Sequence, residues 1–444
     1  MKANYTLFVF LAGAGLLSGC LNTVNLKKEE YLLTSQRTKG NRRVDADALE
    51  GLYQQKPNRE ILGTTPYLWI YYLGKRFFNA DKLRQEIEET TQKYDQRILA
   101  SEAKPKKVLR LRRRKEKKLE DLNVKREEGN YLMRVVGEPP TIFDSTLARK
   151  TTDQMRNYLF SKGYFQGRAT YQFKVDSTRK RVSVTYQVTE NQPYTLRKIE
   201  LVTDDRAIDT LLKQYPDESL LRTGENYDDG NLGAERERID RLLKDHGYFN
   251  FSRQYIVYAV DSTVVDTIRT ANDTLLRGNQ VDIDVRIDTP ANRDRHQVFV
   301  INEVNFVTDA GVRRSTPRDT AVFNNVRYIF YEEEYFKKVL DGKLLIHPGE
   351  KYSQTNAIGT QRLLGNLNMF RFANINFDTT GNRFVANIFT SPLEKYQTSE
   401  EGGLTVLLGL PGPFGNVTFG LLKVFGGLET FELCGRAGLV GQTG

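Results

Sequence analysis

The side chains that could support catalysis are scattered along the 444 residues of the chain. The three histidines, His246, His296 and His347, are far apart, and none belongs to a His-x-x-x-His, Cys-x-x-Cys or Gly-x-Ser-x-Gly pattern. Adjacent acids such as Asp228 and Asp229 are better explained as solvated residues at a helix start. We therefore predict that the protein is not an enzyme and that it has no catalytic, metal-binding or cofactor-binding residues.

Cys20 is the residue for which the sequence predicts a covalent modification. It follows Lys2, the apolar run Leu7 to Leu17, and two small residues, Ser18 and Gly19. The run is too short to span a bilayer but fits a signal peptide. The residues before Cys20 resemble the lipobox of bacterial lipoproteins, which implies cleavage before the cysteine and diacylglycerol on its thiol. The alternative is an ordinary secretory signal in which Cys20 is incidental, and both interpretations predict export.

A dense basic run between Lys104 and Lys118 is the strongest local charge in a chain of net charge +10. Export argues against nucleic acid as its partner, which leaves anionic lipid head groups or an acidic protein surface. A solvated face of a helical hairpin explains the run equally well. The candidate residues are Lys106, Lys107, Arg110, Arg112, Arg113, Arg114, Lys117 and Lys118.

Length and composition predict several folded domains rather than one. A chain of 444 residues exceeds the usual size of a single core. Its 23 Tyr and 24 Phe favour many half-buried strands. Cys434 is the only cysteine besides Cys20, so we expect no disulfide.

Internal repetition carries most of the information in the sequence. Three segments share a pattern typical of a helix end: Leu159 to Phe165, Leu243 to Phe249, and Leu364 to Phe370. Gly163 and Gly247 fit the left-handed residue that ends a helix. Each segment leads into a strand that closes on an Asp-Ser-Thr or Asp-Thr-Thr turn and returns as an alternating strand, as in Val182, Val184, Tyr186 and Val188.

Each repeat is completed by a strand and a helix that precede this segment. The expected first strands are Glu30–Gln36, Tyr194–Val202 and Val298–Val307. The expected first helices are Asp45–Tyr53, Ala207–Tyr215 and Tyr328–Leu340. The sequence thus predicts an α+β fold of strand-helix-helix-strand-strand repeats at 29–191, 192–292 and 297–394, after a signal peptide at 1–19 and a lipidated tether at 20–28.

Two segments lie outside the repeat. Apolar spacing from Ala80 to Arg126, with a break near Pro105, predicts a protruding helical hairpin inside an insertion at about 60–135 of the first repeat. Residues 396–444 are rich in glycine and apolar residues, and the run Leu404 to Leu410 indicates a membrane-type strand. At roughly ten residues per tilted strand this segment supplies about four strands, and a closed barrel needs at least about eight. We therefore expect only the first strands of an antiparallel transmembrane β-barrel.

This repeat, with its Gly-Tyr-Phe helix end and the strands that follow, resembles the POTRA domains of the BamA/TamA-type barrel-assembly superfamily. The lipobox, together with Lys56-Pro57-Asn58 and Gly137-Glu138-Pro139-Pro140, looks closest to TamA-like lipoproteins. The resemblance implies three tandem POTRA domains in the periplasm, lipid-anchored to the outer membrane. The segment Gly426 to Glu429 matches only loosely the Gly-Gly-Glu of an early barrel hairpin.

The resemblance also implies that the second strand of each repeat lies at a sheet edge and adds strands of unfolded outer-membrane proteins. These edges are Arg168–Val175, Ser252–Val260 and Ala373–Phe377, and the alternative is that they only contact neighbouring repeats or water. The candidate residues are Arg168, Tyr171, Phe173, Val175, Tyr255, Val257, Tyr258, Ile375 and Phe377. The predicted function is assembly or translocation of outer-membrane proteins, and the alternatives are a two-partner-type secretion pore component or a structural lipoprotein that docks a TamB-like, inner-membrane-anchored partner.

Overall fold

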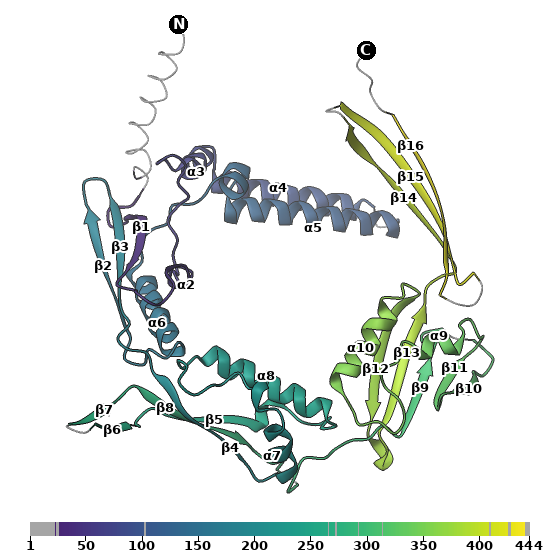
Figure 1. Cartoon of the computed structure of the whole chain (residues 1–444). Helices are drawn as coiled ribbons and strands as arrows, with labels where there is room; N and C mark the ends of the chain where they lie inside the picture. The colour runs from purple at the N-terminus through teal and green to yellow at the C-terminus, as the bar shows by residue number, and fades with distance from the viewer. Residues whose placement is uncertain are drawn as a thin grey trace. The chain divides into compact units, whose positions relative to one another are not determined.

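The computed structural model describes residue 23 and residues 26–101, 104–264, 266–270, 273–291, 293–312, 314–407, 410–424 and 428–439 (Figure 1). The chain divides into two compact units. Residues 1–194 and 226–228 form unit 1, and residues 195–225 and 229–444 form unit 2.

Unit 1 is built on a three-stranded sheet of order β1-β3-β2, in which β3 pairs in parallel with β1 and antiparallel with β2. Its elements are β1 (Leu32–Lys39), α2 (Ala46–Glu50), α6 (Ser145–Ser161), β2 (Arg168–Asp176) and β3 (Arg181–Thr189). The predicted alternation is confirmed, because Val182, Val184, Tyr186 and Val188 of β3 are all buried in the core. Met155 and Leu159 place one face of α6 on the same core.

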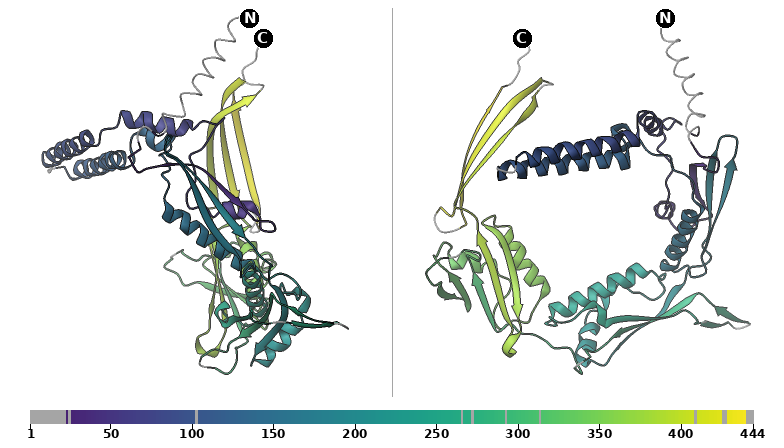
Figure 2. Two further views of the ribbon diagram at one scale, coloured as in Figure 1. Left: turned by 90° about the vertical axis from the view of Figure 1, so that its left-hand side faces the viewer. Right: turned by 180° about the vertical axis from the view of Figure 1, so that it is seen from behind.

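The predicted insertion in unit 1 is helical. It contains α3 (Pro66–Arg76), α4 (Ala80–Leu99), α5 (Pro105–Glu128) and a π-helical turn at Leu132–Val136. α4 and α5 lie antiparallel and project away from the sheet (Figure 2). No α4 residue is buried and only Leu122 of α5 is, so the hairpin has almost no core.

The first sheet of unit 2 has the order β4-β8-β5, which repeats the arrangement of unit 1. Its elements are β4 (Thr195–Thr203), α7 (Arg206–Lys213), α8 (Asp229–Asp245), β5 (Ile256–Asp261) and β8 (Gln280–Ile287), with an additional hairpin of β6 (Asp266–Thr270) and β7 (Asp273–Arg277). The turn expected directly after Asp261 therefore leads into an extension of two strands before the chain returns.

The second sheet of unit 2 differs from the sequence prediction in its first half. Its order is β10-β11-β9-β13-β12, with β9 (Glu303–Val307), β10 (Asp319–Phe323), β11 (Val326–Phe330), α9 (Lys337–Asp341), α10 (Gln354–Gly365), β12 (Phe370–Asp378) and β13 (Val385–Pro392). The helix predicted at Tyr328–Leu340 is wrong, because Tyr328 lies in β11 and only the short α9 is helical. Side chains of Val326 and Tyr328 alternate into the core as strand residues do.

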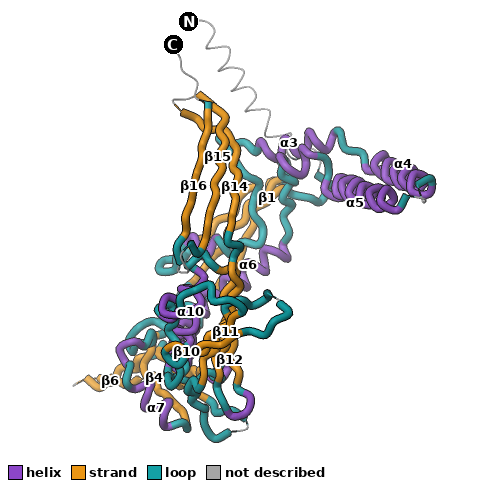
Figure 3. The backbone as a smooth tube through the Cα atoms, turned by 90° about the vertical axis from the view of Figure 1, so that its right-hand side faces the viewer, coloured by secondary structure: helices purple, strands orange, loops and turns teal. Residues whose placement is uncertain are grey.

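The last described segment is a three-stranded antiparallel sheet, β14 (Tyr396–Leu407), β15 (Leu410–Leu422) and β16 (Thr430–Gly438) (Figure 3). Leu407 pairs with Leu410, so the run Leu404 to Leu410 covers the end of one strand and the start of the next rather than one strand. The register aligns Tyr396, Leu421 and Phe431 on one face. Cys434 lies on the opposite, polar face, where its Sγ is 2.9 Å from Oδ1 of Asn416.

The helix ends behave as the sequence predicts. Gly163 and Gly247 have φ of +81° and +103°, and Asn368 takes the equivalent conformation at +54°. The carbonyl of Gly247 accepts a 2.8 Å hydrogen bond from the Phe299 amide, which couples the end of α8 to the segment before β9. Because residues 298–302 make this connection, only the end of the expected strand Val298–Val307 is a strand.

Candidate functional site

β2 is an open edge in unit 1, since it pairs only with β3 among the described strands. Tyr171, Phe173 and Val175 share one face: Tyr171 packs on the core, whereas Phe173 and Val175 are 50% and 40% exposed. The ring of Phe173 lies 5.1 Å from that of Phe143. Arg168 is exposed at the strand start. The four predicted residues of this edge therefore lie on one accessible strand of nine residues.

β5 is the corresponding edge in unit 2, but it begins later than predicted. Tyr255 lies in a single helical turn at Arg253–Tyr255 before the strand and packs against His296 with ring centroids 4.8 Å apart. Tyr255 therefore lies directly before β5 and not within the strand. Val257 is exposed, whereas Tyr258 turns towards α8, where burial raises its pKa.

β12 is the third edge, and it also pairs with one strand only, β13. Ile375 and Phe377 are partly buried against the core of the second sheet of unit 2. They are thus on the strand predicted for them, with their side chains directed mainly inward. The opposite end of this sheet is formed by β10, so the β9 edge is covered.

In two of the three edge strands, a side chain from a neighbouring helix donates a hydrogen bond to a backbone carbonyl of the strand. Nε of Arg236 in α8 donates to the carbonyl of Ile256 in β5 at 3.2 Å, and the Arg236 guanidinium lies 4.9 Å from the Tyr258 ring. Nε2 of Gln361 in α10 donates to the carbonyl of Ala373 in β12 at 3.0 Å. We call Arg236 and Gln361 the edge caps, because each occupies an acceptor that an added strand would use.

The edge caps occupy equivalent places in the two repeats. Arg236 follows Tyr227 by as many residues as Gln361 follows Tyr352, and Ile256 and Ala373 precede their turn aspartates, Asp261 and Asp378, by equal spacings. The equivalent residue in α6 is Thr152, whose short side chain donates instead to the carbonyl of Arg149 at 2.7 Å. β2 consequently has no edge cap from the described residues.

The edge caps belong to no chemical motif in the sequence. Their only sequence signal is the equal spacing in two repeats, which a search for chemical motifs does not detect. A single repeat gives no indication that an arginine on a helix reaches a strand edge.

The eight predicted cations of the basic run are all exposed on α5. None forms an ion pair with another residue in the described part of the chain, whereas their neighbour Lys115 pairs with Asp95 of α4 at 2.6 Å. The run therefore presents uncompensated positive charge along one helix of the hairpin.

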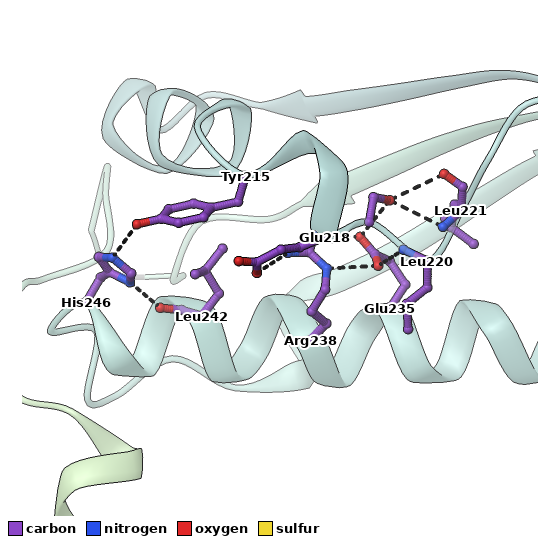
Figure 4. Close-up of polar contacts among 9 residues, drawn as sticks. Tyr215, Glu218, Leu220, Leu221, Glu235, Arg238, Leu242 and His246 are labelled. Atoms are coloured by element: carbon purple, nitrogen blue, oxygen red, sulfur yellow. Dashed lines mark hydrogen bonds and ion pairs between the residues drawn. The ribbon is translucent and has the colours of Figure 1, made fainter.

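A buried polar cluster in unit 2 has a structural explanation. Glu235 is 3% exposed and accepts hydrogen bonds from the Leu220 amide at 2.8 Å, from Ser219, and from Nη2 of Arg238 at 2.7 Å (Figure 4). His246 is bonded to the Leu242 carbonyl at 2.8 Å, also in Figure 4. The bonds to Glu235 fasten the segment 219–221 to α8, whereas the bond of His246 lies at the C-terminal end of that helix.

Two further predictions concern the membrane and metals. Cys20 lies outside the described residues. Among those that are described, no helix has the length and apolarity needed to cross a membrane. Within the same residues, no group of three or more His, Cys, Asp or Glu could hold a metal ion.

Comparison with known families identifies part of the chain. Residues 118–191 match the POTRA family model, described as surface antigen variable number repeat. The match covers the end of α5, α6, β2 and β3. This segment of unit 1 is therefore similar to a POTRA domain. No protein of curated function matches the sequence.

Solved structures show weak similarity. POTRA domains 3–5 of Haemophilus influenzae BamA give a TM-score of 0.31 at 11% identity, covering 83% of this chain and 100% of that one. BamA from Haemophilus ducreyi lacking POTRA domains 1–3 gives 0.33 at 14%, covering 55% and 37%. CdiB from Acinetobacter baumannii gives 0.23 at 12%, covering 56% and 39%. Identities and TM-scores this low carry no functional information.

Proposed function

We propose that the protein is a non-enzymatic factor of the outer membrane that assembles or translocates outer-membrane proteins. Its repeats would lie in the periplasm, anchored by a lipid on Cys20, and would bind unfolded clients by strand addition. The POTRA match over residues 118–191 supports the class of function. The observation that carries the proposal is the uncapped edge of β2.

β2 offers an added strand both backbone and side-chain contacts. Its outer row of amides and carbonyls is the general donor and acceptor set for an extended chain of any sequence. Phe173 and Val175 provide partly exposed apolar surface for alternate client side chains. Outer-membrane strands alternate apolar and polar residues, which suits such a surface.

The edge caps favour β2 over β5 and β12 as the binding strand. An added strand on β5 or β12 would have to displace the hydrogen bond from Arg236 or Gln361. Each such bond contributes about 1 kcal/mol, so client binding there is disfavoured by roughly fivefold. Clients bound at β2 would then pass to a barrel, and a structural lipoprotein that docks a TamB-like partner is the alternative function.

Site-specific photo-crosslinking to an unfolded outer-membrane protein tests the proposal. A photoreactive residue at Gln172 of β2 should crosslink the client more strongly than one at Val257 of β5 or Asn374 of β12. Arg236→Ala and Gln361→Ala, which remove the edge caps, should raise crosslinking at β5 and β12 respectively.

The control variants are measured by crosslinking at the same three positions. Arg236→Ala should leave crosslinking at Gln172 unchanged, and Thr152→Ala should leave all three positions unchanged. Equal crosslinking at all three edges in the unaltered chain would contradict the assignment to β2, and absence of crosslinking at every edge would contradict client binding by strand addition.

A further inference from the structure

The outer face of α3 is apolar and uncovered. Trp69, Leu73 and Phe77 follow one another at one-turn spacing and are 56%, 50% and 72% exposed. The opposite face of the helix is anchored, because Leu68 and Tyr72 are buried in a small core with Leu26 and Leu32. α3 therefore has two apolar faces, and only one of them is used in the fold.

The turn that precedes α3 adds a further exposed apolar residue. Ile61 and Thr64 close it through two backbone hydrogen bonds of 2.7 and 3.0 Å. Leu62 sits at its tip with φ of +51° and is 99% exposed. A leucine is disfavoured in the left-handed region, and full exposure gives it no compensating contact within the fold.

Charge and chain length both point to a lipid bilayer as the occupant of this surface. Lys75 and Arg76 lie at the end of α3, are exposed, and form no ion pair with a described residue. The basic run of α5 adds eight more such cations in the same unit. Leu26 packs against α3 only six residues after Cys20, a span of at most about 20 Å. A lipid on Cys20 would hold α3 at the membrane surface.

We propose that the turn 61–64 and the outer face of α3 insert into the interface of a bilayer with anionic head groups. The tryptophan and phenylalanine would lie at the boundary between head groups and acyl chains, where aromatic residues are favoured. The apolar face would sink about 5–10 Å into this boundary, and the neighbouring cations would contact the phosphates. This contact does not depend on client binding by β2.

Trp69 makes the proposal directly measurable, because it is the single tryptophan of the chain. The full-length lipidated protein is reconstituted in vesicles of phosphatidylethanolamine and phosphatidylglycerol, with and without brominated acyl chains. We expect a blue-shifted Trp69 emission that the brominated lipid quenches. Replacing phosphatidylglycerol by phosphatidylcholine should weaken the quenching.

Variants give the expected size of the effect. Leu62→Glu and Leu73→Glu each remove an inserting apolar side chain and should lower the ratio of inserted to withdrawn Trp69 about tenfold or more. Val322→Glu, at a 69% exposed position of β10 in unit 2, should leave the quenching unchanged. Trp69 emission that is unquenched in vesicles with which the protein co-floats would overturn the proposal, as would equal quenching in Leu62→Glu and Val322→Glu.

Discussion

Phe249 should couple the first and second sheets of unit 2, although it belongs to the helix end of the first. Its ring lies 4.9, 5.0 and 5.5 Å from the rings of Tyr352, Phe384 and Phe377, all of which belong to the core of the second sheet. Phe249→Ala removes this side chain while leaving the backbone bond from Phe299 to Gly247 possible.

The magnitude follows from the burial of the ring. Complete burial makes Phe→Ala cost about 3–5 kcal/mol, and Phe249 is only partly buried, which reduces the expected loss to about 2 kcal/mol. A loss of this size corresponds to a roughly 30-fold increase in the local opening equilibrium.

Hydrogen exchange measured by mass spectrometry reports this opening directly. The amides of Phe299 and Tyr352 are hydrogen-bonded in the junction, to the carbonyls of Gly247 and Phe299 respectively, so they should exchange about 30-fold faster in the variant. Phe372→Ala, at a 48% exposed position of β12, is the matched control and should change their exchange little. Equal exchange in the two variants would refute the inference that Phe249 couples the sheets.

Three further predictions concern stability. Gly163→Ala should destabilise unit 1 by more than about 2 kcal/mol, because φ is +81° and a Cβ would lie 2.6 Å from a carbonyl oxygen. Urea unfolding followed by Trp69 fluorescence measures this loss. The control Gly63→Ala, at φ +73° with no atom within 4 Å of the added Cβ, should cost only about 1 kcal/mol. Glu235→Gln should cost about 2 kcal/mol in unfolding followed by circular dichroism, and an unchanged midpoint would contradict its role in holding residues 219–221. The hydrogen bond from Arg197 holds the pKa of Asp282 below its usual value, so the pair stabilises the fold above about pH 4 and loses this effect as the pH falls through the lowered pKa. Arg197→Met should therefore lower the melting temperature at neutral pH, and the difference from the unaltered chain should shrink in strong acid.

The repeat pattern predicts the three edge strands because it combines several local signals at equal spacings. Glycine at a helix end, an aromatic pair and an Asp-containing turn each have local physical causes, so their recurrence located β2, β5 and β12. The alternation of apolar and polar residues in β3 is equally clear in the sequence, and every second residue from Val182 to Val188 is buried.

The wrong secondary-structure predictions concern short apolar segments, whose residue spacing fits both a helix and a strand. The sequence predicts a helix that starts at Tyr328, but Asn324 and Asn325, at φ of +47° and +62°, form a two-residue turn. This turn makes Val326–Phe330 the second strand of a hairpin. The sequence predicts Tyr255 within the edge strand Ser252–Val260, and its contact with His296 arises only in the tertiary fold. Contacts of this kind have no fixed spacing in the sequence.

The uncapped edge and the predicted anchor belong to the same unit, which constrains how the proposed activities combine. The chain that leads from Cys20 enters the core at Leu26 and continues directly into β1. β1 and β2 are separated only by β3, which is two strand spacings or about 10 Å. A client strand added to β2 would lie one spacing further, about 15 Å from the strand that follows the anchor. A single sheet would therefore fix the distance between the bound client strand and the strand that follows the membrane anchor, whatever orientation unit 2 adopts.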